Sequence, residues 1–170
     1  MYLISNPNGV DVPIQRLQIV FDSLLYPDAN TAIYGRAFHN ERDKGVVPEV
    51  YIGGDYKEVL FDDRYDLTVF FDVSPKVEFL AGGQGSAEVG IVVFCNLKKL
   101  YPTGGRHATE DVERTVIDMI ERYSEFRPLS ITKGFDAVSM FAGEKVRFDM
   151  QPHYVFRVTT KVNYLYNDCL

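Results

Sequence analysis

The sequence has no tryptophan and only two cysteines among its 170 residues. Cys95 and Cys169 cannot build the disulfide framework that stabilises small secreted domains, because such frameworks use several bridges. Cys95 stands in the apolar run of residues 91–97, where a thiol behaves as a small hydrophobe. We therefore expect Cys95 to be a buried core residue.

Long hydrophobic runs are also missing. No stretch approaches the roughly 18 consecutive apolar residues that suggest a membrane span. The N-terminal sequence MYLISNPNGVDVP has no basic region followed by a hydrophobic segment, which a secretory signal requires. We expect a protein that is made in the cytosol and has no membrane partner.

Positive charge is scarce, since 18 lysines and arginines face 24 acidic residues, for a net charge of −6 and a pI near 5.0. A protein that holds nucleic acid by its phosphates needs clustered Lys and Arg, so the composition argues against that class. Residues 40–66 hold eight acidic and four basic residues and so carry −4 of the net charge. We interpret this segment as a solvated face.

Aromatic residues are abundant, with 11 tyrosines and 12 phenylalanines. They supply large buried areas, and tyrosine adds a polar group, so they suit both cores and contact surfaces. The length and the 46% apolar content fit one domain with a full core. We expect a single domain over residues 1–170, with residues 40–86 as a hairpin-rich, acidic extension.

Two segments show the apolar spacing of an amphipathic helix. The first covers residues 11–27, with Asp11 as N-cap and Pro13 in the first turn, where a proline costs no hydrogen bond. The second follows Thr109, its predicted N-cap, and ends before Pro128. The predicted buried stripes are Ile14, Leu17, Phe21 and Leu24 in the first helix and Val112, Val116, Met119, Ile120 and Tyr123 in the second.

Two strand predictions depend on turn residues. Residues 46–63 read as two short strands about the turn at residues 53–55, and Pro48 places the first of them at a sheet edge. Residues 65–75 are rich in β-branched and aromatic side chains and predict a stronger strand. The Ser74-Pro75 pair is expected to end it.

Three further segments read as strands. Residues 31–40 read as a short strand, and residues 87–97 include the largely β-branched run at 89–94. Residues 153–164 alternate apolar and polar side chains, which predicts an antiparallel strand with one face in water. Residues 129–150 are weakly patterned and suggest short strands and turns.

Most of the predicted strands follow one another directly, with a helix near each end of the series. This order predicts an α+β fold, with an antiparallel or mixed sheet, two main helices packed on it, and long hairpin arms. A doubly wound parallel sheet would instead require regular alternation of strands and helices.

The segment Gly82-Gly83-Gln84-Gly85 resembles a phosphate-binding loop at first sight. Such a loop must lead from a strand into a helix N-terminus, because backbone amides and the helix dipole bind the anion. The residues that follow, 89–94, are mostly β-branched and predict a strand instead. The third glycine of a dinucleotide fingerprint and the Gly-Lys-Ser/Thr of a P-loop are both absent from the sequence. We interpret the glycines as a hairpin loop.

The remaining chemical candidates give no catalytic site. A Cys95–His107 pair would need an electropositive, partly open setting, whereas Cys95 stands in a predicted buried strand. No serine has a Gly-x-Ser-x-Gly setting, and no pair of carboxylates can be assigned to acid–base chemistry.

Metal ligands are not apparent either. Asp62, Asp63 and Asp66 lie close together but lack the alternation and closing glutamate of a calcium loop, so we interpret them as solvated turn residues. The three histidines have no second ligand at metal spacing. They are His39, His107 and His153. We predict no catalytic, cofactor-binding or metal-binding residues and no cofactor.

The order of elements resembles that of tail-terminator and head–tail connector proteins of tailed bacteriophages. Three pieces carry the resemblance: residues 12–27, residues 89–123 and residues 152–168. Together they cover under half of the chain. The segment 40–86 is longer and more charged than the family leads us to expect.

The resemblance implies a structural virion protein rather than an enzyme. It implies a homo-oligomeric ring, sixfold or twelvefold, that stacks on neighbouring portal, connector or tail proteins in the neck or tail. Rings of this kind use heterologous interfaces that close by rotation. The hairpins near Gly53-Gly54 and near residues 82–85 are candidates for arms that reach the neighbouring subunit.

The acidic composition has a use in this interpretation. A ring whose lumen carries negative charge repels DNA phosphates, so that DNA passes through as cargo without adhering. Two other classes stay open: a small α+β enzyme or ligand-binding domain that joins residues such as Cys95, Arg106 and His107 in a cleft, and a cytosolic adaptor with an aromatic contact surface.

Overall fold

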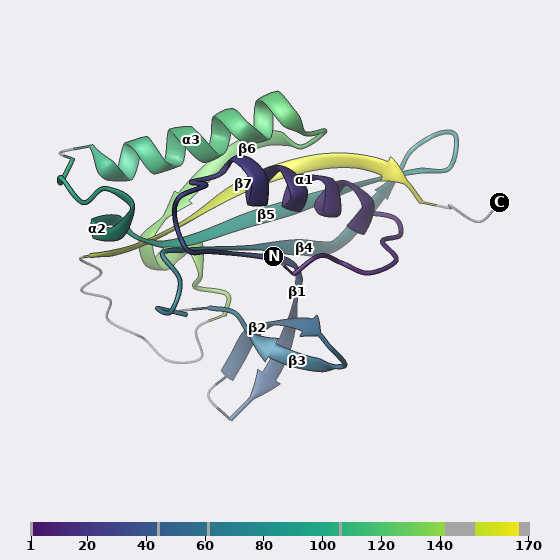
Figure 1. Cartoon of the computed structure of the whole chain (residues 1–170). Helices are drawn as coiled ribbons and strands as arrows, with labels where there is room; N and C mark the ends of the chain where they lie inside the picture. Colours follow the sequence, from purple (N-terminus) through teal and green to yellow (C-terminus); the bar gives the residue numbers. More distant parts are fainter. Residues whose placement is uncertain (1, 44, 61, 106, 142–151, 167–170) are drawn as a thin grey trace.

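The computed structural model describes residues 2–43, 45–60, 62–105, 107–141 and 152–166. These ranges fold around one seven-stranded sheet, which confirms the α+β class (Figure 1). The helices are α1 (Asp11–Leu24), α2 (Leu97–Leu100) and α3 (Ala108–Tyr123), with a 3-10 turn at Gly134–Ala137. The strands are β1 (Thr31–Arg42), β2 (Gly45–Ile52), β3 (Asp55–Glu58), β4 (Leu67–Phe79), β5 (Gln84–Asn96), β6 (Arg127–Lys133) and β7 (His153–Leu165).

The sheet is mixed. Its strand order is β3-β2-β1-β4-β5-β7-β6, in which β1 and β4 pair in parallel and the other described neighbours pair antiparallel. The β2–β3 hairpin lies in the connection between the two parallel strands. Figure 1 shows β1 bending so that β2 and β3 turn away from the other strands.

Helices α1 and α3 lie on the same face of the sheet (Figure 1). The apolar stripe of α1 is buried at Ile14, Leu17 and Phe21. That of α3 is buried at Val116 and Ile120, in the same core cluster. Each helix therefore covers the sheet with most of the face that its apolar spacing predicts. Leu24, which was predicted to be buried, is 45% exposed at the last position of α1.

Both predicted N-caps are wrong by one or two residues. Val10 is the N-cap of α1 and His107 that of α3, and neither side chain makes a capping hydrogen bond. Asp11 and Thr109 lie inside the first turns instead. Tyr123, which was predicted to be buried, is 54% exposed because it is the last residue of α3.

The opposite face of the sheet carries a second core. Its buried members include Tyr34, Phe70, Phe94, Val138, Phe141 and Val155. The prediction that one face of the last strand is wet is therefore wrong in the middle of β7, where the Arg157 side chain is only 12% exposed. The alternating pattern placed the strand correctly but did not show that both of its faces are covered.

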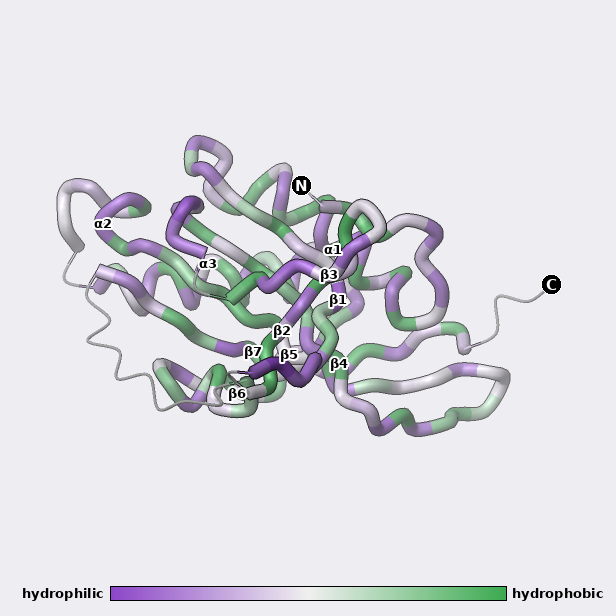
Figure 2. The backbone as a smooth tube through the Cα atoms, turned by 90° about the horizontal axis from the view of Figure 1, so that it is seen from below, coloured by the Kyte–Doolittle hydropathy of each residue, from purple (hydrophilic) through white to green (hydrophobic). Residues whose placement is uncertain are grey.

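Strands β4 and β5 form a long hairpin that projects beside the C-terminal end of the chain (Figure 2). The prediction that the strand at residues 65–75 ends at Ser74-Pro75 is wrong. This strand is β4, and it continues past an irregularity in register between Val73 and Val77. The pairing of β1 with β4 stops at Asp72. In the described chain one side of β4 is therefore unpaired beyond that point, and a proline is tolerated there.

The β2–β3 hairpin turns at Gly53-Gly54, as predicted, and both glycines have a positive φ. Pro48 does not mark an edge strand, since β2 lies between β1 and β3. Pro48 lies just outside the register of β2 with β3, which begins at Glu49 opposite Glu58, and its carbonyl accepts a hydrogen bond from Val59 N–H. Residues 67–72, inside the predicted 40–86 extension, are buried.

Candidate functional site

The glycine loop is a hairpin turn, as predicted. Gly82 and Gly83 have positive φ values and connect β4 directly to β5. The element after the loop is a strand, so no helix N-terminus faces the glycine amides. The loop therefore lacks the geometry by which a strand–glycine–helix unit binds phosphate.

Cys95 and His107 do not form a catalytic pair. Cys95 is 1% exposed in the core of the sheet, and burial raises the pKa of its thiol to about 12. The thiolate is the reactive form of cysteine, so this thiol is inert near neutral pH. His107 is exposed at the start of α3. The third residue of this proposed cleft, Arg106, lies outside the described residues, as does Cys169.

The acidic turn holds its carboxylates apart. Asp62 accepts hydrogen bonds from the Arg64 guanidinium, which lower the pKa of this carboxyl. Asp66 forms an ion pair with Lys99 at 2.9 Å, while Asp63 is exposed. Within the described ranges no group of three or more His, Cys, Asp or Glu side chains could hold a metal ion.

A charged cluster that the sequence analysis missed lies on the second face of the sheet. The buried carboxylate of Asp72 is 2.5 Å from Arg157 Nη1 and 2.6 Å from His39 Nε2. The cluster joins three strands, β1, β4 and β7. The His39 ring packs edge-on against Phe141, not against a nucleophile. We assign these residues a structural role, because a buried carboxylate requires partners.

A second missed cluster holds α3 against the sheet. Glu113 is 7% exposed although it is charged. Its carboxylate accepts a hydrogen bond from the Tyr154 hydroxyl and lies 2.7 Å from Lys133 Nζ. These contacts join α3 to β6 and β7 and satisfy the buried charge.

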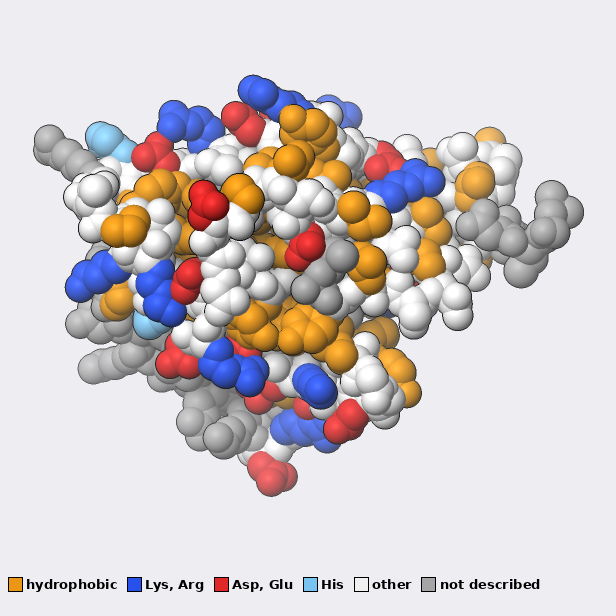
Figure 3. All heavy atoms as spheres, in the orientation of Figure 1, with side chains coloured by type: hydrophobic (Ala, Val, Ile, Leu, Met, Phe, Trp, Pro, Cys, Tyr) orange, Lys and Arg blue, Asp and Glu red, His pale blue; other side chains and the backbone are white. Residues whose placement is uncertain are grey.

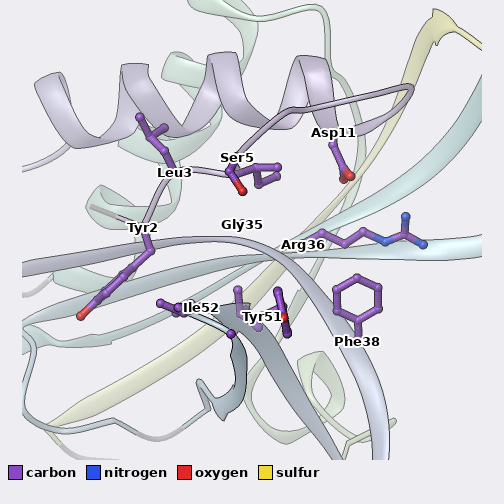
Figure 4. A pocket seen from close by; sticks show the side chains of 13 residues that line it. Tyr2, Leu3, Ser5, Asp11, Gly35, Arg36, Phe38, Tyr51 and Ile52 are labelled. Carbon is purple, nitrogen blue, oxygen red and sulfur yellow. The ribbon is translucent and has the colours of Figure 1, made fainter. Parts of the chain in front are cut away.

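A groove of about 400 Å³ lies between the N-terminal segment and strands β1 and β2 (Figure 4). Its walls are mainly apolar and aromatic and include Tyr2, Leu3, Ile4, Phe38, Val50, Tyr51 and Ile52. Asp11 and Arg36 lie at one end of it (Figure 4). Asp11 Oδ1 is buried and has no hydrogen-bond partner among the residues that the structure describes. Burial raises the pKa of this carboxyl, and the charge of Arg36 opposes that shift.

A projecting surface lies at the far end of the β4–β5 hairpin. We call residues 76–86 and 163–166 the arm, because β4, β5 and β7 pair there as three strands. Its apolar side chains are unusually exposed, at 72% for Phe79, 54% for Leu165, 47% for Tyr166 and 41% for Leu80. Figure 3 shows hydrophobic side chains on this projection, at the right of the view.

The β2–β3 end of the molecule is acidic. Glu41, Asp43 and Glu58 line a shallow hollow there, together with Arg42 and Val47. Arg42 is bound to the carboxylate of Glu49, so it does not balance the three exposed acids. This end is where the predicted solvated acidic face lies.

No protein-family model matches this chain, and no curated protein sequence matches it. Among the described helices, none combines the length and the apolar character needed to cross a membrane. The groove, the arm and the acidic end are the surfaces of the described chain that offer contacts to another molecule.

Proposed function

We propose that this chain is a structural protein that assembles into a homo-oligomeric ring in the neck or tail of a tailed bacteriophage, with DNA passing through the ring. The observation that carries the proposal is the arm. It presents exposed apolar side chains, with Phe79 at 72% exposure, on a projection formed by three paired strands. Contiguous apolar surface of this kind favours a protein partner.

A ring is the assembly that such an arm favours. An arm that contacts a different surface of the next copy makes a heterologous interface, and repeated heterologous contacts close into a ring when the rotation fits. We propose six or twelve copies, as the resemblance to connectors and tail terminators implies. Portal, connector or tail proteins would then cover the two flat faces of the ring.

The acidic end suits a DNA passage. Each copy has a net charge of −6, and Glu41, Asp43 and Glu58 concentrate negative charge around one hollow. If these residues line the lumen, they repel the phosphates of the passing duplex, so that DNA moves through without binding.

Electron microscopy of the negatively stained, purified chain tests this proposal. The expected result is round particles with a central opening, with the β2–β3 end facing the opening in a reconstruction. Neighbouring genes for portal or capsid proteins would support the virion assignment. Monomers alone, even when the neighbouring virion proteins are added, would contradict the ring, and an acidic end on the outer wall would contradict only the lumen assignment.

A ligand-binding domain is the second candidate, and the groove favours it. A volume of about 400 Å³ lies within the range of small-molecule sites, roughly 300–1,000 Å³. A monomer that binds a small apolar amine, with affinity lost on Asp11→Asn, would support this function over the ring. A monomer that binds a single host protein through the exposed aromatic rings of Phe38, Tyr51 and Tyr56 would instead indicate an adaptor.

A further inference from the structure

The arm has the features of an inserting element. Its strands stay paired almost to the tip, with Phe79 opposite Gly85 and Gln84 opposite Leu165. The Gly83 carbonyl also accepts a hydrogen bond from Tyr166 N–H. A projection held in this way loses little conformational entropy when it binds.

The tip is uncharged and narrow. Residues 79–87 contain no charged side chain. Gly82 and Gly83 form the turn, and a Cβ atom added to either of them would meet no atom within 4 Å. Exposed polar donors are present beside the apolar side chains, because Gln84 is exposed and carries a carboxamide. The tip can therefore enter an apolar groove without burying a charge.

The groove has matching features. Its apolar and aromatic walls include Leu3 and Tyr51, which are 43% and 58% exposed. At its charged end, Asp11 Oδ1 is a buried acceptor that lacks a donor within the described part of the chain. A buried acceptor without a partner destabilises the protein, so an occupant that supplies an N–H group is favoured there.

The arm cannot fill the groove of its own chain. None of residues 76–86 lines it, and three paired strands hold the arm in its projecting position. Among the described residues, one chain thus carries an uncovered apolar projection and, on a separate surface, an uncovered apolar groove with an unsatisfied acceptor. A second copy of the chain satisfies both, and each copy can give and receive the contact.

We propose, building on the ring function above, that the arm tip of one copy docks into the groove of the next. Phe79 and Leu80 pack against the apolar walls of the groove, and a donor at the tip, such as the Gln84 carboxamide, binds Asp11 Oδ1. The contact is heterologous, so its repetition produces a closed ring when the rotation between copies fits, instead of a twofold dimer.

Site-specific cross-linking tests this docking. In a Cys169→Ser background, one sample carries Ala81→Cys at the tip and another carries Ser5→Cys in the groove. The two are mixed, and a short bis-maleimide is added. We expect covalent dimers from this mixture and a ladder up to the ring copy number from the double variant. Ser23→Cys, exposed on α1 and outside the groove, replaces Ser5→Cys as the matched control and should give no dimers.

The outcomes separate this inference from the ring function. Rings that give no tip-to-groove cross-link overturn the docking but leave the ring function intact. Dimers from the Ala81→Cys sample alone indicate tip-to-tip contact and also overturn it. A chain that stays monomeric under all conditions overturns both. Phe79→Ser gives an independent measurement: because Phe79 is 72% exposed, the variant should fold normally, yet its particle mass should fall to that of the monomer.

Discussion

At the residue scale, a side chain on the neighbouring strand accounts for the presence of glycine, which has no Cβ atom, at position 90. A Cβ atom at this position would lie 2.2 Å from Cζ of Arg157, whose guanidinium is held by Asp72. The guanidinium cannot move aside without leaving the buried carboxylate. A glycine within a strand often marks such a close approach.

We expect Gly90→Ala to lower the free energy of unfolding by about 1–3 kcal/mol, the usual cost of overpacking. Urea denaturation measures this. Gly105→Ala is the matched control, because its added Cβ would meet its nearest atom at 3.7 Å, and it should change stability by less than about 0.5 kcal/mol. In an Arg157→Ala background the cost of Gly90→Ala should largely disappear. An unchanged cost in that background would show that Arg157 is not its cause.

The buried thiol of Cys95 makes stability depend on pH. Its pKa rises from 9.0 to about 12 on folding, because burial disfavours the thiolate. Above pH 9 the unfolded chain therefore holds fewer protons on this group than the native chain does. The contribution of the protonated Cys95 thiol to the free energy of unfolding is complete below pH 9 and is lost as the pH rises toward 12.

We expect the free energy of unfolding of the wild-type chain to fall more steeply than that of Cys95→Ala above pH 9, by up to about 1.4 kcal/mol per pH unit. Denaturant titrations at pH 8, 9, 10 and 11 on both proteins provide the comparison. The buried tyrosines titrate in both proteins, so the difference isolates the thiol. Parallel curves would mean that the native thiol is solvated, which would reopen Cys95 as a nucleophile.

At the element scale, the buried face of α3 includes one charged residue, Glu113, beside its apolar stripe. The apolar spacing predicts the helix but not that Glu113 is buried between Lys133 and Tyr154. These partners lie 20 and 41 residues away in the sequence. Local patterns therefore cannot identify them.

We expect Tyr154→Phe to lower the free energy of unfolding by about 1.5–3 kcal/mol, the usual contribution of a hydrogen bond to a charged group. The ring stays in place and only the hydroxyl is removed, so packing is preserved. Tyr123→Phe, at an exposed tyrosine of α3, should change the value by less than about 0.5 kcal/mol. Equal, small effects in chemical denaturation would contradict the proposed role of the Glu113 cluster.

The elements that local pattern predicts well are α1, the β2–β3 hairpin and β7. Their spacing, glycine turn and alternation are properties of neighbouring residues. The end of β4 could not be predicted in this way. Pro75 is tolerated because β1 has already stopped pairing with β4, and that depends on tertiary structure.

The candidate surfaces were only partly visible in the sequence. The glycine loop marked the position of the arm tip, and the acidic segment marked the β2–β3 end. The groove could not be predicted, because it brings Asp11 and Leu3 of the N-terminal segment against Tyr51 of β2. Two features of the sequence could have indicated the cluster around Arg157. They are a charged residue within a strand, Asp72, and a glycine within a strand, Gly90.

At the scale of the whole molecule, this chain is proposed to act through self-association. Cys95 and His107, the pair that the sequence analysis considered and rejected, lie in different settings: Cys95 is buried, and His107 is exposed at the start of α3. In this proposal, a second copy of the chain covers the exposed arm and fills the groove. We propose that the acidic end lines the lumen of this assembly and repels DNA.

The mass of the native particle tests this account most directly. Native mass spectrometry of the purified chain, over a range of concentrations and with the neighbouring virion proteins present or absent, should show a closed species of six or twelve times the 19.4 kDa chain mass. A species that remains at one chain mass under all of these conditions would contradict the ring.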